Sequence, residues 1–83
     1  MKTLIDNNTT LDSVKKDIKS NIGHNIIVQE LNKQKKIIHE YHGKIVDAYD
    51  NVFLVAINIH NYIVNKAFNY IDFSVGELNY IFD

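Results

Sequence analysis

Four histidines are the residues of this sequence best suited to bind a metal ion, and two of them lie in the stretch HEYH at 39–42. The zinc-binding pattern HExxH has one more residue between its histidines. On a β-strand, His39 and His42 point to opposite faces of the sheet, so they cannot converge on one ion. His24 and His60 would have to come from other elements. We therefore predict surface imidazoles, with no metal and no cofactor.

The carboxylates suggest no catalytic pair. Asp47 and Asp50 are close in sequence, but they flank a predicted turn, where Asp commonly bonds to its own backbone. The sequence contains no nucleophile elbow and no phosphate-binding glycine loop. It also has no cysteine, which excludes thiolate ligands and disulfides. The sequence therefore predicts a protein that is not an enzyme.

Lysines form the third chemically active group, and they are unevenly distributed. Residues 11–44 hold seven Lys against four acidic residues, a net charge of +3, whereas residues 45–83 hold one Lys against five acids, a net charge of −4. A basic half of this kind could face a polyanion. The candidate contact residues for nucleic acid or a protein partner are Lys15, Lys16, Lys19, Lys33, Lys35, Lys36 and Tyr41.

Two other interpretations of these lysines stay open. A lysine-bearing strand edge discourages aggregation with another sheet, which needs no ligand. The basic and acidic halves could also complement each other in the fold or in a homodimer. For nucleic acid, Tyr41 or Tyr49 would supply the ring on which a base stacks.

A helix is predicted at 10–21, before the lysine-bearing strands in the chain. Thr10 is a suitable N-cap, and the helix then has apolar residues at spacings of three and four, which form one stripe. Gly23 stands where a left-handed C-cap is expected. Residues 1–9 are polar without periodicity and are predicted to be a flexible tail, so that 10–83 form the single folded domain. The apolar stripe consists of Leu11, Val14, Ile18 and Ile22.

After Gly23 the pattern changes to that of β-strands. "HNIIVQEL" and "KKIIHEYH" read as exposed antiparallel strands joined by a loop at "NKQ", and Gly43 suggests a bulge or sharp bend. The apolar run Val52–His60 reads as a central strand, preceded by a turn at Asp50-Asn51. A turn at Asn61 leads into the strand "YIVNKAFNY", with Tyr62, Val64, Phe68 and Tyr70 on one face. "IDFSVG" is a turn, and "ELNYIF" is the last strand.

One helix followed by about five antiparallel strands predicts a mainly β fold, a small barrel with the helix over one end. The high content of Ile, Val, Tyr and Phe agrees with this. Most of the aromatic residues are expected in the core, and any that remain outside favour protein interfaces. The chain has no signal-peptide pattern and no apolar run long enough to span a membrane, so we expect a cytoplasmic protein.

The spacing of landmarks resembles that of the Veg family of small proteins from low-GC Gram-positive bacteria. The family pattern has L-x-x-I-K-x-x-L-x-x-x-L-G, a basic glycine-containing loop, S-G-x-L-x-x-T-Y-P-S-V-F and a closing S-Y-S-Y-x-D-V-L. The corresponding segments here begin at Leu11, at Gly43 and at Phe68. The loop is different, because "ELNKQKK" contains lysines where the family has Gly and Arg, and Lys lacks the planar fork of Arg.

This resemblance implies an SH3-like or Sm-like barrel behind an N-terminal helix. It also implies a non-catalytic protein that stimulates biofilm formation through control of gene expression. Our first prediction is therefore a regulator that acts by protein contact. The alternatives are direct binding of RNA or DNA by the lysine-bearing helix and hairpin, and a structural subunit without a ligand.

Overall fold

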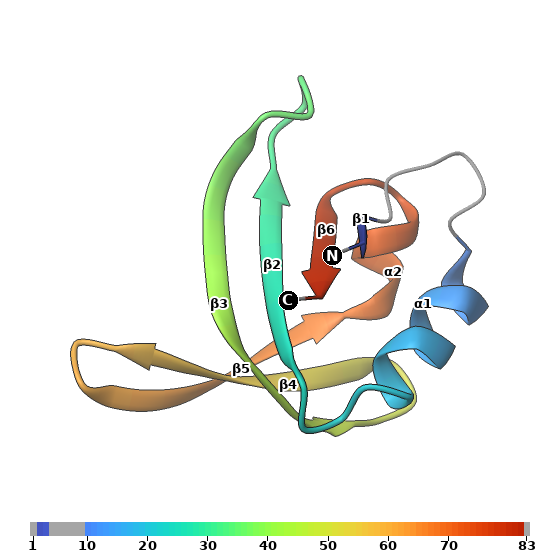
Figure 1. The fold of residues 1–83 in the computed structure, drawn as a ribbon. Helices are drawn as coiled ribbons and strands as arrows, with labels where there is room; N and C mark the ends of the chain where they lie inside the picture. Colours follow the sequence, from blue (N-terminus) through green and yellow to red (C-terminus); the bar gives the residue numbers. More distant parts are fainter. Residues whose placement is uncertain (1, 4–9, 83) are drawn as a thin grey trace.

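The computed structural model describes residues 2–3 and 10–82 of the 83-residue chain. Its strands form one antiparallel sheet in the order β1-β6-β2-β3-β4-β5, and both helices pack against the same core (Figure 1). The mainly β prediction, with a helix near the N-terminus, is confirmed. The elements are β1 (Lys2–Thr3), α1 (Leu11–Lys19), β2 (Asn25–Leu31), β3 (Ile37–Ala48), β4 (Val52–Ile59), β5 (Tyr62–Asn69), α2 (Tyr70–Ser74) and β6 (Leu78–Phe82).

Helix α1 begins at the predicted cap. The Ser13 N–H donates to Thr10 Oγ1 and the Thr10 N–H donates to Ser13 Oγ, both at 3.2 Å, which is a reciprocal capping box. The helix ends two residues earlier than predicted, at Lys19. Gly23 does have a positive φ of 92°, but it serves the turn into β2, since its N–H donates to Ile45 O over 2.8 Å.

The structure describes only two residues of the predicted N-terminal tail. Of residues 1–9, only Lys2 and Thr3 are described, and they pair with Phe82 and Ile81 of β6. Residues 1 and 4–9 lie outside the described part of the chain, so the prediction of a flexible tail stays untested there.

Strand β3 bends the sheet at Gly43. This residue pairs with Ile26 of β2 and with Ile57 of β4, so it marks the point where β3 leaves one neighbour and joins the other. Figure 1 shows that β3 is curved and that β4 and β5 cross the direction of β2. The predicted bend is confirmed, but the register shift of β3 occurs further along, between Ile45 and Asp47.

Strand β4 is the buried central strand that its apolar run predicts. Phe53, Val55 and Ile57 are buried, whereas Ile59 is exposed at the end of the strand. The strand stops one residue short of His60, because His60 and Asn61 form a two-residue turn with φ angles of 49° and 69°. Strand β2 departs from prediction: it lies between β6 and β3 and is largely buried rather than exposed.

The predicted turn after β5 is a short helix, and it explains why the sheet stays open. In α2, Tyr70 and Phe73 are buried, and the helix turns the chain back to β6. Strand β6 pairs with β2 and β1 instead of β5. The predicted barrel is therefore not closed, because the chain that leaves β5 returns to the opposite side of the sheet.

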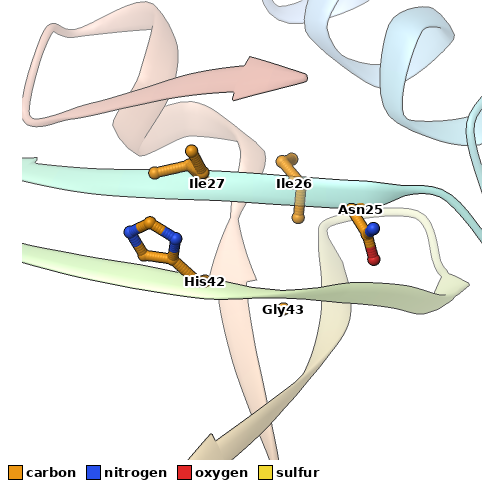
Figure 2. Close-up of a pocket in the computed structure, with 5 residues that line it drawn as sticks. All are labelled: Asn25, Ile26, Ile27, His42 and Gly43. Atoms are coloured by element: carbon orange, nitrogen blue, oxygen red, sulfur yellow. The ribbon is translucent and has the colours of Figure 1, made fainter. Parts of the chain in front are cut away.

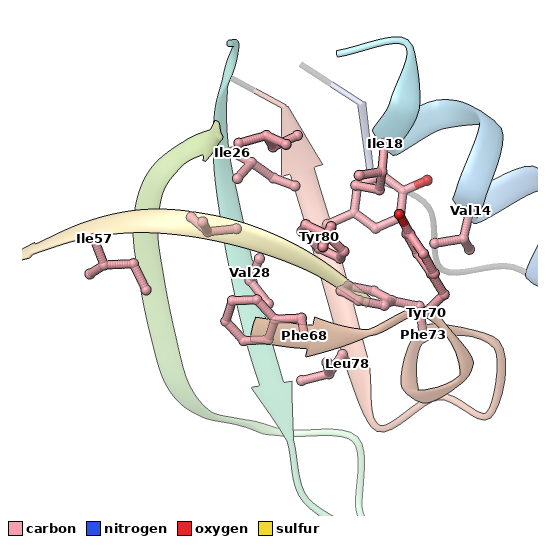
Figure 3. Packing of buried hydrophobic residues seen from close by; sticks show 13 residues of the cluster. Val14, Ile18, Ile26, Val28, Ile57, Phe68, Tyr70, Phe73, Leu78 and Tyr80 are labelled. Carbon is pink, nitrogen blue, oxygen red and sulfur yellow. The ribbon is translucent and has the colours of Figure 1, made fainter. Parts of the chain in front are cut away.

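The core lies between the bent sheet and the two helices (Figure 3). Phe53 is at its centre, with ring centroids 5.8 Å from Phe68, 5.5 Å from Tyr70 and 5.7 Å from Phe73. Helix α1 contributes buried Val14 and Ile18 to the same cluster. Aromatic rings have large apolar surfaces, so their burial contributes strongly to the stability of so small a domain.

Candidate functional site

The structure does not bring the six candidate lysines together. Lys15, Lys16 and Lys19 lie on α1, which precedes one end of β2, and Lys33, Lys35 and Lys36 lie in the loop that follows its other end (Figure 1). A seven-residue strand is about 20 Å long. The candidate contact lysines therefore form two separate groups of three.

Several of these lysines have local contacts. Lys15 Nζ lies 5.8 Å from the centroid of the Tyr70 ring, within the range of a cation–π contact. Lys16 and Lys19 occupy the last turn of α1, where a positive charge favours the helix dipole. Lys35 Nζ donates to the carbonyl oxygen of Gly76 over 2.9 Å. These contacts agree with structural roles.

A groove of about 510 Å³ separates the loop after β2 from the turn before β6. Lys33 and Lys35 line it, but so does Glu77. An acid beside the two lysines reduces the attraction for an anion. The groove is thus lined by side chains of both charges and is not a specific anion-binding site.

The Tyr41 ring packs against neighbouring side chains and is not fully exposed to solvent. Its ring is half-buried, 5.7 Å from Phe68 and 6.3 Å from the stacked ring of His39. Lys66 Nζ lies 5.2 Å from the Tyr41 centroid. The sequence did not pair these residues, because their contact depends on the register of three strands. Tyr49 is exposed, and hydrogen bonding and charge from Asp47 raise its pKa.

Two of the four histidines, His39 and His42, bond to carboxylates on the sheet surface. His39 Nδ1 is 3.0 Å from Glu30 Oε1, and His42 Nε2 is 2.7 Å from Glu40 Oε1. Among residues 2–3 and 10–82, no cluster of three or more His, Cys, Asp or Glu side chains could hold a metal ion. A shallow pocket of about 270 Å³ adjoins His42 between β2 and β3, lined also by Asn25, Ile26, Ile27 and Gly43 (Figure 2).

A row of polar side chains crosses three neighbouring strands. Asn79 Nδ2 donates to Gln29 Oε1 over 2.8 Å, and Gln29 Nε2 donates to Glu40 Oε2 over 2.9 Å. These bonds join β6, β2 and β3. The bond from Gln29, followed by that from His42, holds the pKa of Glu40 below its ordinary value. The row stabilises the sheet surface and contains no reactive group.

The most prominent exposed apolar surface is the tip of the β4–β5 hairpin. Tyr62 is 75% exposed and Ile63 is 66% exposed, with Ile59 and Val64 close to half exposed. Figure 1 shows this hairpin extending away from the helices and beyond β3. We define these four residues as the hairpin tip. Apolar side chains that cluster at a protrusion mark a surface for protein contact.

The sequence did not identify the hairpin tip. Tyr62, Val64, Phe68 and Tyr70 were predicted to share one face; Phe68 and Tyr70 are buried, whereas Tyr62 and Val64 are exposed. The alternation was correct, because Val64 and Phe68 do lie on the same face of β5. However, the core ends before the strand does. One signal was present in the sequence: residues 51–65 contain no Asp, Glu, Lys or Arg.

Fold and surface together define a small mainly β domain with one capped N-terminal helix and an exposed apolar hairpin. The chain belongs to the VEG family, described as biofilm formation stimulator, whose sequence profile matches residues 9–74. This match runs from the cap of α1 to the end of α2 and thus leaves out β6. No curated protein matches the chain. Within the described residues, no helix is long and apolar enough to cross a membrane.

Proposed function

We propose that this chain is a non-catalytic cytoplasmic regulator that stimulates biofilm formation, affecting gene expression through protein contacts at the hairpin tip. The family supports the biological role. The exposure of Tyr62 and Ile63 carries the proposal for the mechanism, since large apolar side chains gain free energy when a partner covers them. The proposed contact surface therefore consists of apolar side chains that bind a partner and do not take part in catalysis.

Complementation of a deletion strain tests this proposal. A strain without the gene receives either the wild-type gene or the double variant Tyr62→Ser/Ile63→Ser, and biofilm mass and transcript levels are measured. We expect the tip variant to accumulate as a folded protein but to restore little biofilm. The matched control is Ile37→Ser/Ile38→Ser, which removes two apolar side chains of 52% and 51% exposure from β3.

The control variant should restore biofilm formation like the wild type. Full activity of the tip variant would contradict the proposed contact surface. Loss of activity in both variants at equal protein levels would contradict it as well, because the effect would then not be specific to the tip.

Direct binding of RNA or DNA is the second candidate, and the exposed lysines of the loop after β2 favour it. The purified protein is titrated with mixed nucleic acid at low and moderate salt. Salt-sensitive binding that is lost in Lys33→Glu/Lys35→Glu/Lys36→Glu would establish this function. Under the first proposal, we expect no binding even at low salt.

A further inference from the structure

The open edge of β5 presents backbone hydrogen-bonding groups in a defined order. Strand β5 is last in the sheet, and among the described residues it pairs with β4 alone. Because the turn has two residues, Ile59 and Tyr62 form the hydrogen-bonded pair that closes the hairpin. The same alternation reaches the far end of the ladder, where the Tyr70 N–H donates to Asn51 O over 3.1 Å.

This alternation determines which backbone groups face outward. The residues between the hydrogen-bonded pairs direct their N–H and C=O away from β4. On β5 these residues are Ile63, Asn65 and Ala67. The ladder between β4 and β5 has no register shift, so the outward groups are regularly spaced. They can receive another antiparallel strand.

Apart from Lys66, which lies on β5 itself, the edge lacks the features that normally prevent such pairing. Proteins protect exposed edges with charged residues, proline or bulges. Residues 57–65 contain no proline and no Asp, Glu, Lys or Arg. The nearest charge is Lys66, whose side chain is half-buried with Nζ over the ring of Tyr41. An exposed edge that carries no charge between residues 57 and 65 is a place where a further strand can add to the sheet.

A second copy of this chain suits the edge because a neutral hairpin meets itself without repulsion between like charges. The register in which Val64 faces Val64 of the second copy is the most favourable. It pairs the outward groups of Ile63 with those of Asn65, and it places Lys66 opposite the uncharged Tyr62. It also separates the two lysines along the strands, whereas a register centred on Lys66 would oppose them.

The exposed area indicates how tight this association is. The four side chains of the hairpin tip expose roughly 400 Å² per copy, if an aromatic side chain presents about 200 Å². Two copies bury at most roughly twice this area, because Ile59 lies on β4, one strand away from the pairing edge, and pairing covers only part of each side chain. Stable complexes bury about 1,200–2,000 Å², so the area fits a reversible dimer.

We propose that two copies of this chain form a symmetric dimer in which their β5 edges pair antiparallel about Val64, making one continuous sheet. The inference rests on the proposed function in one respect, since it names a partner for the hairpin tip. Only the two β5 strands need to meet, and each keeps its pairing with β4.

Sedimentation velocity of the full chain over a wide range of concentration tests the dimer. The wild type should shift from monomer to dimer as its concentration rises. Val64→Lys and Val64→Glu should each be monomeric, because like charges then face each other across the axis. An equal mixture of the two variants should recover the dimer. The matched control Ile38→Lys adds the same charge on β3 and should dimerise like the wild type.

A proline variant tests the backbone pairing without a charge. Asn65→Pro removes an N–H that the β4 ladder does not use, so the hairpin should stay folded by circular dichroism while the dimer is lost. A wild type that stays monomeric, a dimer that persists in Val64→Lys or Asn65→Pro, or a mixture that stays monomeric would each overturn the proposal. If the Tyr62→Ser/Ile63→Ser variant still loses biofilm stimulation in that case, the proposed function survives with a different partner.

Discussion

The hydroxyl of Tyr80 on β6 donates a hydrogen bond to Oδ2 of Asp17 on α1 over 2.7 Å, joining residues that are 63 positions apart. The Tyr80 ring is buried, with its centroid 5.4 Å from that of Phe73. The bond therefore connects the last strand to the first helix beside the aromatic core. It orients α1 in a way that apolar packing alone, which is not directional, would not.

Removing this bond should destabilise the protein. We expect Tyr80→Phe to lower the free energy of unfolding by about 1–2 kcal/mol, because a hydrogen bond to a charged group is lost while the ring still fills its place. Urea unfolding followed by fluorescence or circular dichroism measures the change. Tyr70→Phe is the matched control: the Tyr70 hydroxyl is buried, and none of the described residues hydrogen-bonds to it. The control should lose no stability, and equal losses in both variants would contradict the assignment.

Alkaline pH should unfold this domain through the same tyrosines. Burial, followed by the bond and charge of Asp17, raises the pKa of Tyr80, and burial raises the pKa of Tyr70. The folded state therefore keeps protons that the unfolded state loses above about pH 10, so stability is fully present below that pH and falls above it. Unfolding free energies measured at a series of alkaline pH values should show this decline. It should be shallower in Tyr80→Phe, and an equal slope would contradict the prediction.

Gly43 should not tolerate a side chain. A Cβ at this position would lie 2.6 Å from Val55 Cγ1 and closer still to the carbonyl oxygen of Ala56. We expect Gly43→Ala to lower the free energy of unfolding by about 1–3 kcal/mol, as overpacking does. Thermal unfolding measures the change. Lys44→Ala, at the exposed next position of β3, is the control and should change stability little.

The β4–β5 turn should gain stability from glycine. Asn61 has a φ of 69°, in the left-handed region that glycine adopts without a steric penalty. We expect Asn61→Gly to stabilise the protein by up to about 1 kcal/mol, since the type I′ turn of a two-residue hairpin prefers glycine at its second position. Chemical denaturation checks the gain, and His60→Ala, which puts a residue without a local polar contact at a φ of 49°, should lose stability instead.

The pKa of Glu40 should be lower than that of an ordinary glutamate. The hydrogen bond from Gln29 is the main cause of its lowered pKa, so Gln29→Ala should raise that pKa toward the ordinary value. Because the folded-state pKa is lowered, Glu40 favours the folded state above about pH 4.3 and loses that contribution as the pH falls. Carboxyl chemical shifts followed by NMR measure the midpoint. His39→Ala is the control, since His39 bonds to Glu30, and it should leave the midpoint of Glu40 unchanged.

Much of the secondary structure could be predicted because its signals are local. The cap at Thr10, the loop predicted at 32–34 and the turn predicted at Asn61 each depend on a few adjacent residues. In the structure the loop extends to 36, and the turn also includes His60. The helix α2 was missed because its formation depends on tertiary contacts. The sequence "IDFSVG" was assigned to a turn because it is too short to show helical periodicity, and α2 forms there because Tyr70 and Phe73 reach the core together.

The candidate site was predicted less well than the fold. Lys15 and Lys33 were grouped by their charge, but a strand of about 20 Å separates their elements. The contact of Lys66 with Tyr41 was not foreseen, since it requires the registers of β3, β4 and β5 together. The sequence gives the charge and type of each residue, but it does not give the distances between side chains on different elements.

The sequence by itself therefore determined the elements and the family: a capped helix, apolar strands, turn residues and their spacing. Only the tertiary structure decided that the sheet stays open, that Gly43 is its corner, and that Tyr62 and Ile63 reach solvent. The physical reason is the range of the interactions. Caps and turns depend on neighbouring residues, but exposure depends on where the core ends, and that is set by packing between residues far apart in the chain.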